Sequence, residues 1–141
     1  MPDHLAILKP AYLRLILKGA KTIECRLTRT PKPPFGVLAK GERIYLKESS
    51  GPVLAVARAS KVICQQIDSP EELAGIRREY GQEIMAREDF WESKNNCRYC
   101  TLVFLEGVEA LSKPFRINKN DMRGWVLVDG GQGFDWPNKR T

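Results

Sequence analysis

The sequence predicts an α+β fold, a small, mostly antiparallel β-barrel with helices flanking its openings. Much of the chain has the pattern of short strands, and in the one at 21–27 apolar and polar residues alternate, as they do in a half-buried strand. Turn residues separate most of these segments, and only two regions have helical periodicity. The repeated strand–helix–strand units of a parallel, doubly wound sheet are missing from the sequence. Short strands joined by turns favour a barrel.

The first half of the chain predicts a strand, a short helix and three more strands. Pro10 suits the first turn of a helix, and Gly19 suits its end. Three prolines after Thr28 exclude a sheet ladder there, because proline has no N–H to donate. We expect a strand at 4–9, a helix at 10–18, strands at 21–27, 43–47 and 53–63, and a loop at 28–36.

The second half begins with a strong helix signal. Ser69, Pro70 and Glu72 have the spacing of a capping box with proline in the first turn. We expect the helix to break near Gly81 and to resume as far as Trp91. The remaining expected elements are a strand at 99–110 that bends at Gly107, a loop at 112–122 and a strand at 125–128.

Length and charge limit the possible classes of protein. The 141 residues are most simply one domain, which we place at 1–128, followed by a flexible tail at 129–141. Trp91 and Trp125 are expected in the core, whereas Trp136 in the tail has no evident burial partner.

The net charge of +6 favours a polyanionic partner, although a basic, solvated surface explains it equally well. No apolar run reaches the length of a membrane span, and the first residues lack the pattern of a secretory signal. We therefore expect a cytoplasmic protein with no membrane partner.

The four cysteines are expected to be thiols. Cys97 and Cys100 have the spacing of one metal-binding knuckle, but a structural zinc site needs a second pair of ligands, and the chain has a single histidine. Cys25 and Cys64 lie in apolar, strand-like contexts that are typical of core cysteine. We expect no cofactor, and metal binding by Cys97 and Cys100 stays open.

The main candidate site is the run from Gly19 to Arg26, which contains Lys21, Glu24 and Arg26. An ion pair on an exposed surface contributes less than about 1 kcal/mol, so such a cluster is more useful in a cleft. Three residues separate Lys21 from Glu24, and a regular pleat would put them on opposite faces. Both reach one cleft only if Lys21 lies in the turn before the pleat begins. Otherwise Lys21 extends to solvent while Glu24 and Arg26 pair across strands.

The run Gly19-Ala20-Lys21-Thr22-Ile23-Glu24-Cys25-Arg26 resembles the G-x-K-x-x-E-x-R signature of the ASCH domain, a branch of the PUA-like β-barrels. The opening 8–12 segment and the strands that follow the signature also resemble this family, over about residues 4–128. The resemblance implies a PUA-like barrel, a cleft between sheet and helices, and a role in RNA-linked processes. It implies that Lys21, Glu24 and Arg26 line that cleft.

Some ASCH proteins are enzymes that deacetylate an acetylated cytidine or cleave RNA without metal. The deacetylase type uses a lysine, a threonine three residues later and a distant glutamate. Lys21 matches the lysine, but Glu24 stands at the threonine position, and the neighbouring Thr22 should face the other way on a strand. The resemblance therefore does not carry the deacetylase nucleophile into this chain.

Further residues extend the candidate site. Arg29 and Lys32 lie in the proline-stiffened loop, which either grips a nucleic-acid backbone or is a solvated connector. Tyr45 either packs in the barrel or stacks on a base. A late basic group either extends a phosphate track or is a solvated face; it consists of Arg116, Asn118, Lys119, Asn120 and Arg123.

The predicted function is binding of RNA or single-stranded nucleic acid, with an unstacked base in the cleft. Glu24 would accept a hydrogen bond from an exocyclic amine, and Lys21 and Arg26 would contact phosphate. The alternative is a hydrolase, either a metal-independent ribonuclease or an amidohydrolase acting on a modified nucleoside. There Lys21 would stabilise an oxyanion and Glu24, with a raised pKa, would be the general base. A third reading is a protein-interaction adaptor. The oligomeric state stays open.

Overall fold

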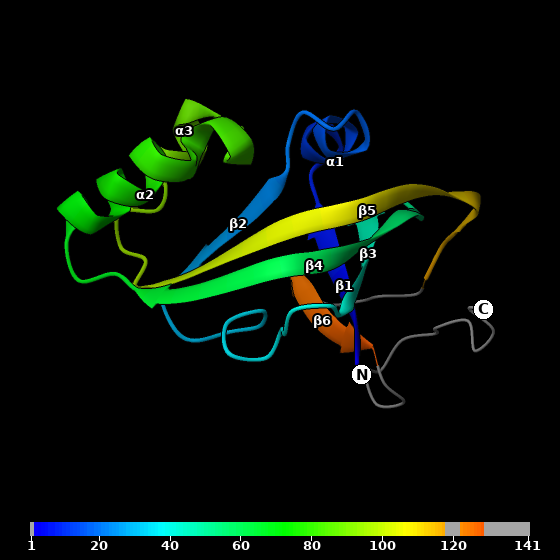
Figure 1. Ribbon diagram of the computed structural model, residues 1–141, viewed down its shortest axis with the longest axis horizontal. Helices are drawn as coiled ribbons and strands as arrows, with labels where there is room; N and C mark the ends of the chain where they lie inside the picture. Colours follow the sequence, from blue (N-terminus) through cyan, green and yellow to red (C-terminus); the bar gives the residue numbers. More distant parts are fainter. Residues whose placement is uncertain (1, 118–121, 129–141) are drawn as a thin grey trace.

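The computed structural model describes residues 2–117 and 122–128 of the chain. Its six strands form one sheet in the order β2-β5-β4-β3-β1-β6, and three helices flank it (Figure 1). The elements in chain order are β1 (Asp3–Leu8), α1 (Pro10–Leu17), β2 (Ile23–Thr28), β3 (Arg43–Glu48), β4 (Val53–Gln66), α2 (Pro70–Ile84), α3 (Glu88–Glu92), β5 (Tyr99–Phe115) and β6 (Trp125–Val128).

The sheet is a curled half-barrel, and the predicted α+β barrel class is confirmed. Every pair of neighbouring strands is antiparallel except β1 and β3, which are parallel. The two longest strands, β4 and β5, pair along almost their whole length and cross the molecule in Figure 1. Their register shifts three times, between Val53 and Ala55, Val56 and Arg58, and Ala59 and Lys61. Such irregularities bend and twist a strand, and they let this sheet curl.

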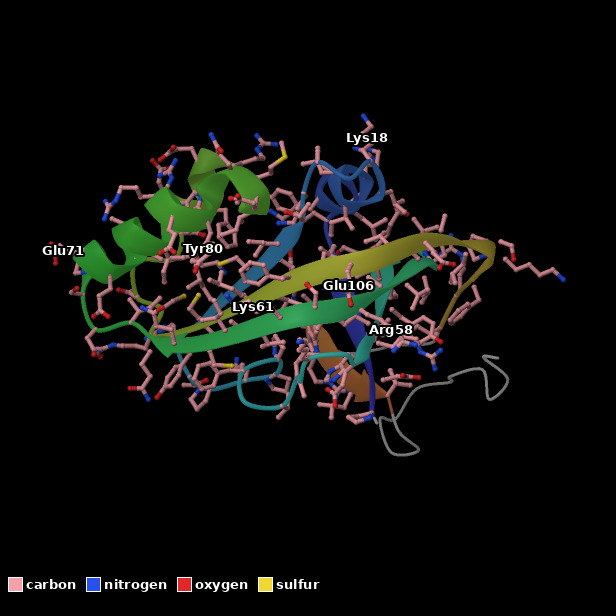
Figure 2. The ribbon with its side chains drawn as sticks, viewed as in Figure 1. Lys18, Arg58, Lys61, Glu71, Tyr80 and Glu106 are labelled. Carbon is pink, nitrogen blue, oxygen red and sulfur yellow. The ribbon has the colours of Figure 1, made fainter. Side chains whose placement is uncertain are left out.

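Apolar side chains cover both faces of the sheet and divide the core. The α1 side contains Leu13 and Ile16, packed with Ala6, Leu46 and Trp125. On the other side, the helical segment α2–α3 covers β2 and β5, and its core includes Ile23, Cys25, Leu27, Ile76, Ile84, Trp91 and Leu102. Tyr80 reaches from α2 toward the sheet (Figure 2) and packs edge-to-face on Phe104, with ring centroids 5.8 Å apart. Strand β2 is an edge strand of the sheet, and its apolar side chains pack under α2.

The helical segment differs from its predicted form. Ser69 caps α2 as expected, with its side chain accepting from the Glu72 backbone N–H. The predicted break at Gly81 is wrong, because α2 continues to Ile84 and ends at Met85, whose φ is +52°. A glycine costs a helix only about 1 kcal/mol, and the buried Ile84 anchors the last turn in the core. The helical residues around Trp91 form a separate helix, α3.

The long hairpin also extends beyond its prediction. Strand β5 continues to Phe115, which pairs with Val53, so the loop predicted at 112–122 is wrong for its first four residues. Gly107 has φ +58°, in keeping with the predicted bend. Trp91 and Trp125 are buried as expected, and β6 has its predicted bounds. The 129–141 tail with Trp136 lies outside the described residues, and the boundary at residue 128 remains a prediction. No helix in the described part of the chain is long and apolar enough to cross a membrane.

Candidate functional site

Lys21 lies in the turn between α1 and β2, before the pleat of β2 begins at Ile23. Gly19, with φ +81°, ends the helix, and the backbone N–H groups of Ala20 and Lys21 both donate to Leu15 O. The chain then turns so that the Thr22 N–H donates to Glu83 O at the end of α2. Because Lys21 precedes the regular pleat, its side chain can reach that of Glu24 although the two residues are three positions apart.

The Lys21 ammonium is a buried structural centre. Its side chain is 2% exposed, and Nζ lies 3.0 Å from Ile23 O, 2.5 Å from Ile84 O and 3.2 Å from Glu24 Oε1. An ammonium has three N–H donors, and these three acceptors match that number. The Tyr12 ring lies beside it, with its centroid 5.3 Å from Nζ. Lys21 thus ties the end of α2 to β2 and holds the Glu24 carboxylate.

Glu24 is an ionised carboxylate held between two cations. Its residue is 9% exposed; Oε1 faces Lys21, and Oε2 accepts from Arg26 Nε at 2.7 Å. Burial raises the pKa of Glu24, but the charges and hydrogen bonds of Arg26 and Lys21 outweigh it, so the pKa lies below its ordinary value. The direction is opposite to the one that the general-base role requires. Glu24 is an acceptor at neutral pH.

Arg26 closes the seam between the two ends of the curled sheet. Its Nη1 donates to Gly124 O at 3.0 Å, and its Nη2 donates to Ile7 O at 2.9 Å. Ile7 N also donates to Gly124 O, so the guanidinium continues the ladder between β1 and the residue before β6. The guanidinium lies over the Trp125 ring at 5.3 Å. A side chain from β2 therefore replaces backbone pairing at this point of the barrel.

A cavity of about 520 Å³ opens beside this seam. Glu24 and Arg26 line it, while Lys21 lies behind Glu24 and is not among the lining residues. Three stretches of the chain form the wall: the end of β1 with the start of α1, strand β2, and helix α3 with the residues after it. The lining consists of Ile7, Leu8, Lys9, Tyr12, Glu24, Cys25, Arg26, Leu27, Thr28, Asp89, Phe90, Ser93 and Lys94. Its size is in the range of small-molecule sites.

The other predicted binding residues do not converge on this cavity. Tyr45 is 3% exposed and packs with Leu5 and Val53 on the other face of β3, so the packing alternative describes it. Arg29 and Lys32 are exposed in the loop after Thr28, the last residue of the β2 wall. Arg116 and Arg123 are exposed at the two ends of the segment that leads to β6, and Asn118, Lys119 and Asn120 lie outside the described residues.

Sequence reasoning missed the contribution of α3. Phe90, Ser93 and Lys94 form one wall of the cavity, more than sixty residues after Glu24. Their spacing gives only a short helical signal, which is equally typical of a surface turn. The helical segment is held over the site by Lys21 at Ile84 and by the Tyr12 hydroxyl, which accepts from the Arg87 N–H at 3.1 Å.

A buried network behind Arg26 was missed as well. Trp125 Nε1 donates to His4 Nδ1 at 3.1 Å, and His4 Nε2 lies 2.8 Å from Glu42 Oε1. Indole nitrogen only donates, so His4 Nδ1 accepts and Nε2 carries the proton toward Glu42. Burial raises the pKa of Glu42, but the Ala39 N–H and His4 outweigh it and lower the pKa. The network holds the Trp125 ring, over which the Arg26 guanidinium lies. The only sequence signal was the single histidine.

The cysteines show no cluster suited to a metal. Among the described residues, no three His, Cys, Asp or Glu side chains are grouped to hold an ion. Cys25 and Cys100 are buried against each other, and the pKa of Cys25 is raised well above its ordinary value by the hydrogen bond with Cys100 and by burial. Cys64 is exposed, so its predicted core position is wrong. It lies on β4, which stays paired with β5 as far as Gln66 and Tyr99.

A second cavity of about 440 Å³ lies between the start of α2 and α3. Trp91 and Leu73 form its apolar floor, and Arg77 at its rim is paired with Glu88. The charges around it largely offset one another. None of the predicted site residues lines it, although Cys97 does.

The fold of this chain is similar to that of solved ASCH structures. The crystal structure of ASCH from Zymomonas mobilis has a TM-score of 0.70 with this chain at 15% sequence identity, covering 90% of this chain and 87% of its own. A serine-to-alanine variant of that protein gives 0.70 at 18% identity, covering 92% of both chains. A DUF984 protein from Enterococcus faecalis gives 0.53 at 16% identity, covering 78% of this chain and 77% of its own. No family model matches the sequence, and a comparison with curated proteins finds no match. The predicted ASCH fold is thus confirmed by structure.

Proposed function

We propose that this protein binds RNA or another single-stranded nucleic acid and receives one unstacked base in the seam cavity, the space of about 520 Å³ beside Glu24 and Arg26. The observation that carries the proposal is the ionised Glu24 carboxylate, aligned by Lys21 and Arg26 and facing that cavity. A fixed acceptor beside guanidinium donors is the pattern that reads a base edge. The ASCH fold supports the same class of ligand.

The charges around the cavity support the backbone part of the proposal. The charged residues that line it are three cations, Lys9, Arg26 and Lys94, and two carboxylates, Glu24 and Asp89, and the cationic Arg29 follows its last β2 residue. The chain as a whole carries +6. Phosphate contacts supply most of the affinity in nucleic-acid binding, and they make it fall with added salt.

The hydrolase alternative has less support from the site. A general base works best with a pKa near the working pH, whereas the pKa of Glu24 is lowered. Lys21, the expected electrophile, has its ammonium bonded to two carbonyls and to Glu24. The arrangement is better suited to holding a ligand than to transferring a proton.

The direct test is fluorescence anisotropy with labelled single-stranded RNA at several salt concentrations. We expect an affinity that falls steeply with salt, and a loss of at least about tenfold for Arg26→Lys, because a lysine cannot hold Glu24 and the Ile7 and Gly124 carbonyls at the same time. Arg78→Ala, at an exposed arginine of α2 that lines neither cavity, is the matched control. Equal affinity for wild type and Arg26→Lys, or no salt dependence, would remove the proposal.

An activity assay separates binder from hydrolase. The purified protein is incubated in chelator with structured RNA and with acylated nucleosides, and products are followed by chromatography. The binding proposal expects no turnover. Turnover that Glu24→Gln abolishes, in a variant that still folds, would instead establish the enzyme.

A further inference from the structure

Helix α3 gives the seam cavity an aromatic wall. Phe90 is half-buried and lines the cavity opposite the β2 residues Glu24 and Arg26. Its ring packs edge-to-face on the buried Trp91, with centroids 5.2 Å apart and an angle of 86° between the rings. That contact restrains the ring, so Phe90 is held in place at the wall of the cavity. A rigid aromatic surface needs little ordering when a ligand binds.

A cation stands beside this ring. Lys94 Nζ lies 5.3 Å from the Phe90 centroid, and Lys94 lines the same cavity. The ammonium lies over the ring, as in a cation–π contact. An aromatic surface with an adjacent ammonium matches the two parts of a nucleotide, because the base stacks on the ring and the phosphate attracts the cation.

The floor of the cavity is the free edge of β2. Leu105 N donates to Thr22 O, and the antiparallel register continues through Glu24 with Val103 and Arg26 with Thr101. Residues that bond to the partner strand alternate with residues whose backbone groups face away from it. The backbone groups of Cys25 and Leu27 therefore face the open edge.

Two further observations agree with this orientation. Ile23, in the same alternate set, directs its carbonyl away from β5 and accepts from Lys21 Nζ. Cys25 and Leu27 line the cavity although their side chains belong to the core under α2. The surface that they offer the cavity is thus peptide backbone, which carries both donors and acceptors.

We propose that Phe90 is the stacking platform for the bound base and that the Lys94 ammonium leaves its place over the ring to contact the adjacent phosphate. The hydrogen-bonding edge of the base then faces Glu24 and the free backbone edge of β2. The inference rests on the proposed function and assigns the stacking of the base to α3, while the edge of the base is read by Glu24 and β2.

The experiment measures affinity for a short single-stranded RNA and for the same RNA with one abasic site at each position in turn. For wild type, an abasic site at the position read by the cavity weakens binding. Phe90→Leu keeps an apolar side chain but loses the aromatic face, and we expect it to weaken intact RNA by about 5- to 150-fold. It should bind intact and abasic RNA equally, whereas Phe90→Trp should keep the affinity and the difference.

Phe104 provides the matched control. It is also half-buried in the core under α2, and Lys61 Nζ lies 5.3 Å from its ring centroid, but it lines neither cavity. Lys61 is labelled on β4 in Figure 2. Phe104→Leu and Lys61→Ala should leave RNA affinity unchanged, while Lys94→Ala should reduce the salt dependence by about one phosphate contact.

The outcomes separate the inference from the function on which it rests. RNA binding that is salt-sensitive and weakened by Arg26→Lys, but unchanged in Phe90→Leu, overturns the role of α3 and leaves the binding function intact. No RNA binding by wild type overturns both. Thermal unfolding of each variant is compared with that of Phe104→Leu, so a loss of folding is not counted as a loss of stacking.

Discussion

Lys21 and Ile84, sixty-three residues apart, are joined by a hydrogen bond of 2.5 Å from the ammonium to the last carbonyl of α2. The same ammonium holds Glu24 at 3.2 Å. One buried cation therefore connects the helical segment that covers the cavity with the carboxylate that faces it. Lys21 acts as a positioning residue, and its removal should affect both folding and ligand binding.

Lys21→Met should lower the free energy of unfolding by about 1–3 kcal/mol, because buried acceptors lose their donor while Glu24 keeps only Arg26 as its charged partner. The Ile84 carbonyl also loses its donor. Urea unfolding followed by circular dichroism measures the change. Lys61→Met, at an exposed lysine, should stay within about 0.5 kcal/mol of wild type. A loss below about 1 kcal/mol for Lys21→Met would contradict the structural role.

Glu24→Gln should remove one part of the pH dependence of stability. The folded pKa of Glu24 is below its ordinary value of 4.5, so its contribution is fully present above that value and is lost as the pH falls through the lowered pKa. The difference in unfolding free energy between wild type and Glu24→Gln should be constant from pH 7 to pH 5.5 and shrink below pH 4.5. Glu42 also has a lowered pKa, and it contributes equally to both proteins. A difference that stays constant down to pH 3 would contradict the lowered pKa.

Gly124→Ala should displace the Arg26 guanidinium. A Cβ at Gly124 would lie 3.0 Å from Arg26 Nη1, which is bound to the carbonyl of the same glycine. We expect a loss of about 1 kcal/mol, the scale of one hydrogen bond, and weaker RNA binding. Gly75→Ala in α2 is the control, since its Cβ meets only Arg78 at 3.6 Å and should stabilise the helix by about 1 kcal/mol. Unchanged stability in Gly124→Ala would show that the seam tolerates a shifted guanidinium.

His4→Phe should destabilise the fold although it keeps an aromatic ring in the core. Trp125 loses its acceptor and Glu42 loses a donor, and each unsatisfied buried group costs about 1–3 kcal/mol. Chemical denaturation measures the loss. Nuclear magnetic resonance of wild type should show a neutral histidine with the proton on Nε2 and a slowly exchanging Trp125 indole N–H. A protonated Nδ1 at neutral pH would contradict the network.

Most elements follow from local patterns. The amphipathic period and Pro10 predict α1, and the alternation around Glu24 predicts β2, because each signal lies within a few residues. The ends of the long hairpin do not follow from local sequence. Strand β5 extends to Phe115 because Val53 pairs with it, and the polar residues before Phe115 give no sign of that pairing.

The sequence also limits the candidate site to a few residues. It predicts that Lys21 and Glu24 can meet if Lys21 precedes the pleat, and the structure has that arrangement. It does not predict that the lysine lies behind the carboxylate, or that Arg26 reaches across to Ile7 and Gly124. These contacts depend on how far the sheet curls.

The fold class and the local cluster of charges can be predicted from the amino-acid sequence, since alternation, turns and the spacing of the motif act over short stretches of chain. Which of those charges face a cavity, and which are paired inside the protein, depends on the folded chain. Sheet curvature and the docking of α3 bring together residues from β1, β2 and the helical segment. Their separation along the chain leaves no periodic signal that sequence reasoning can read.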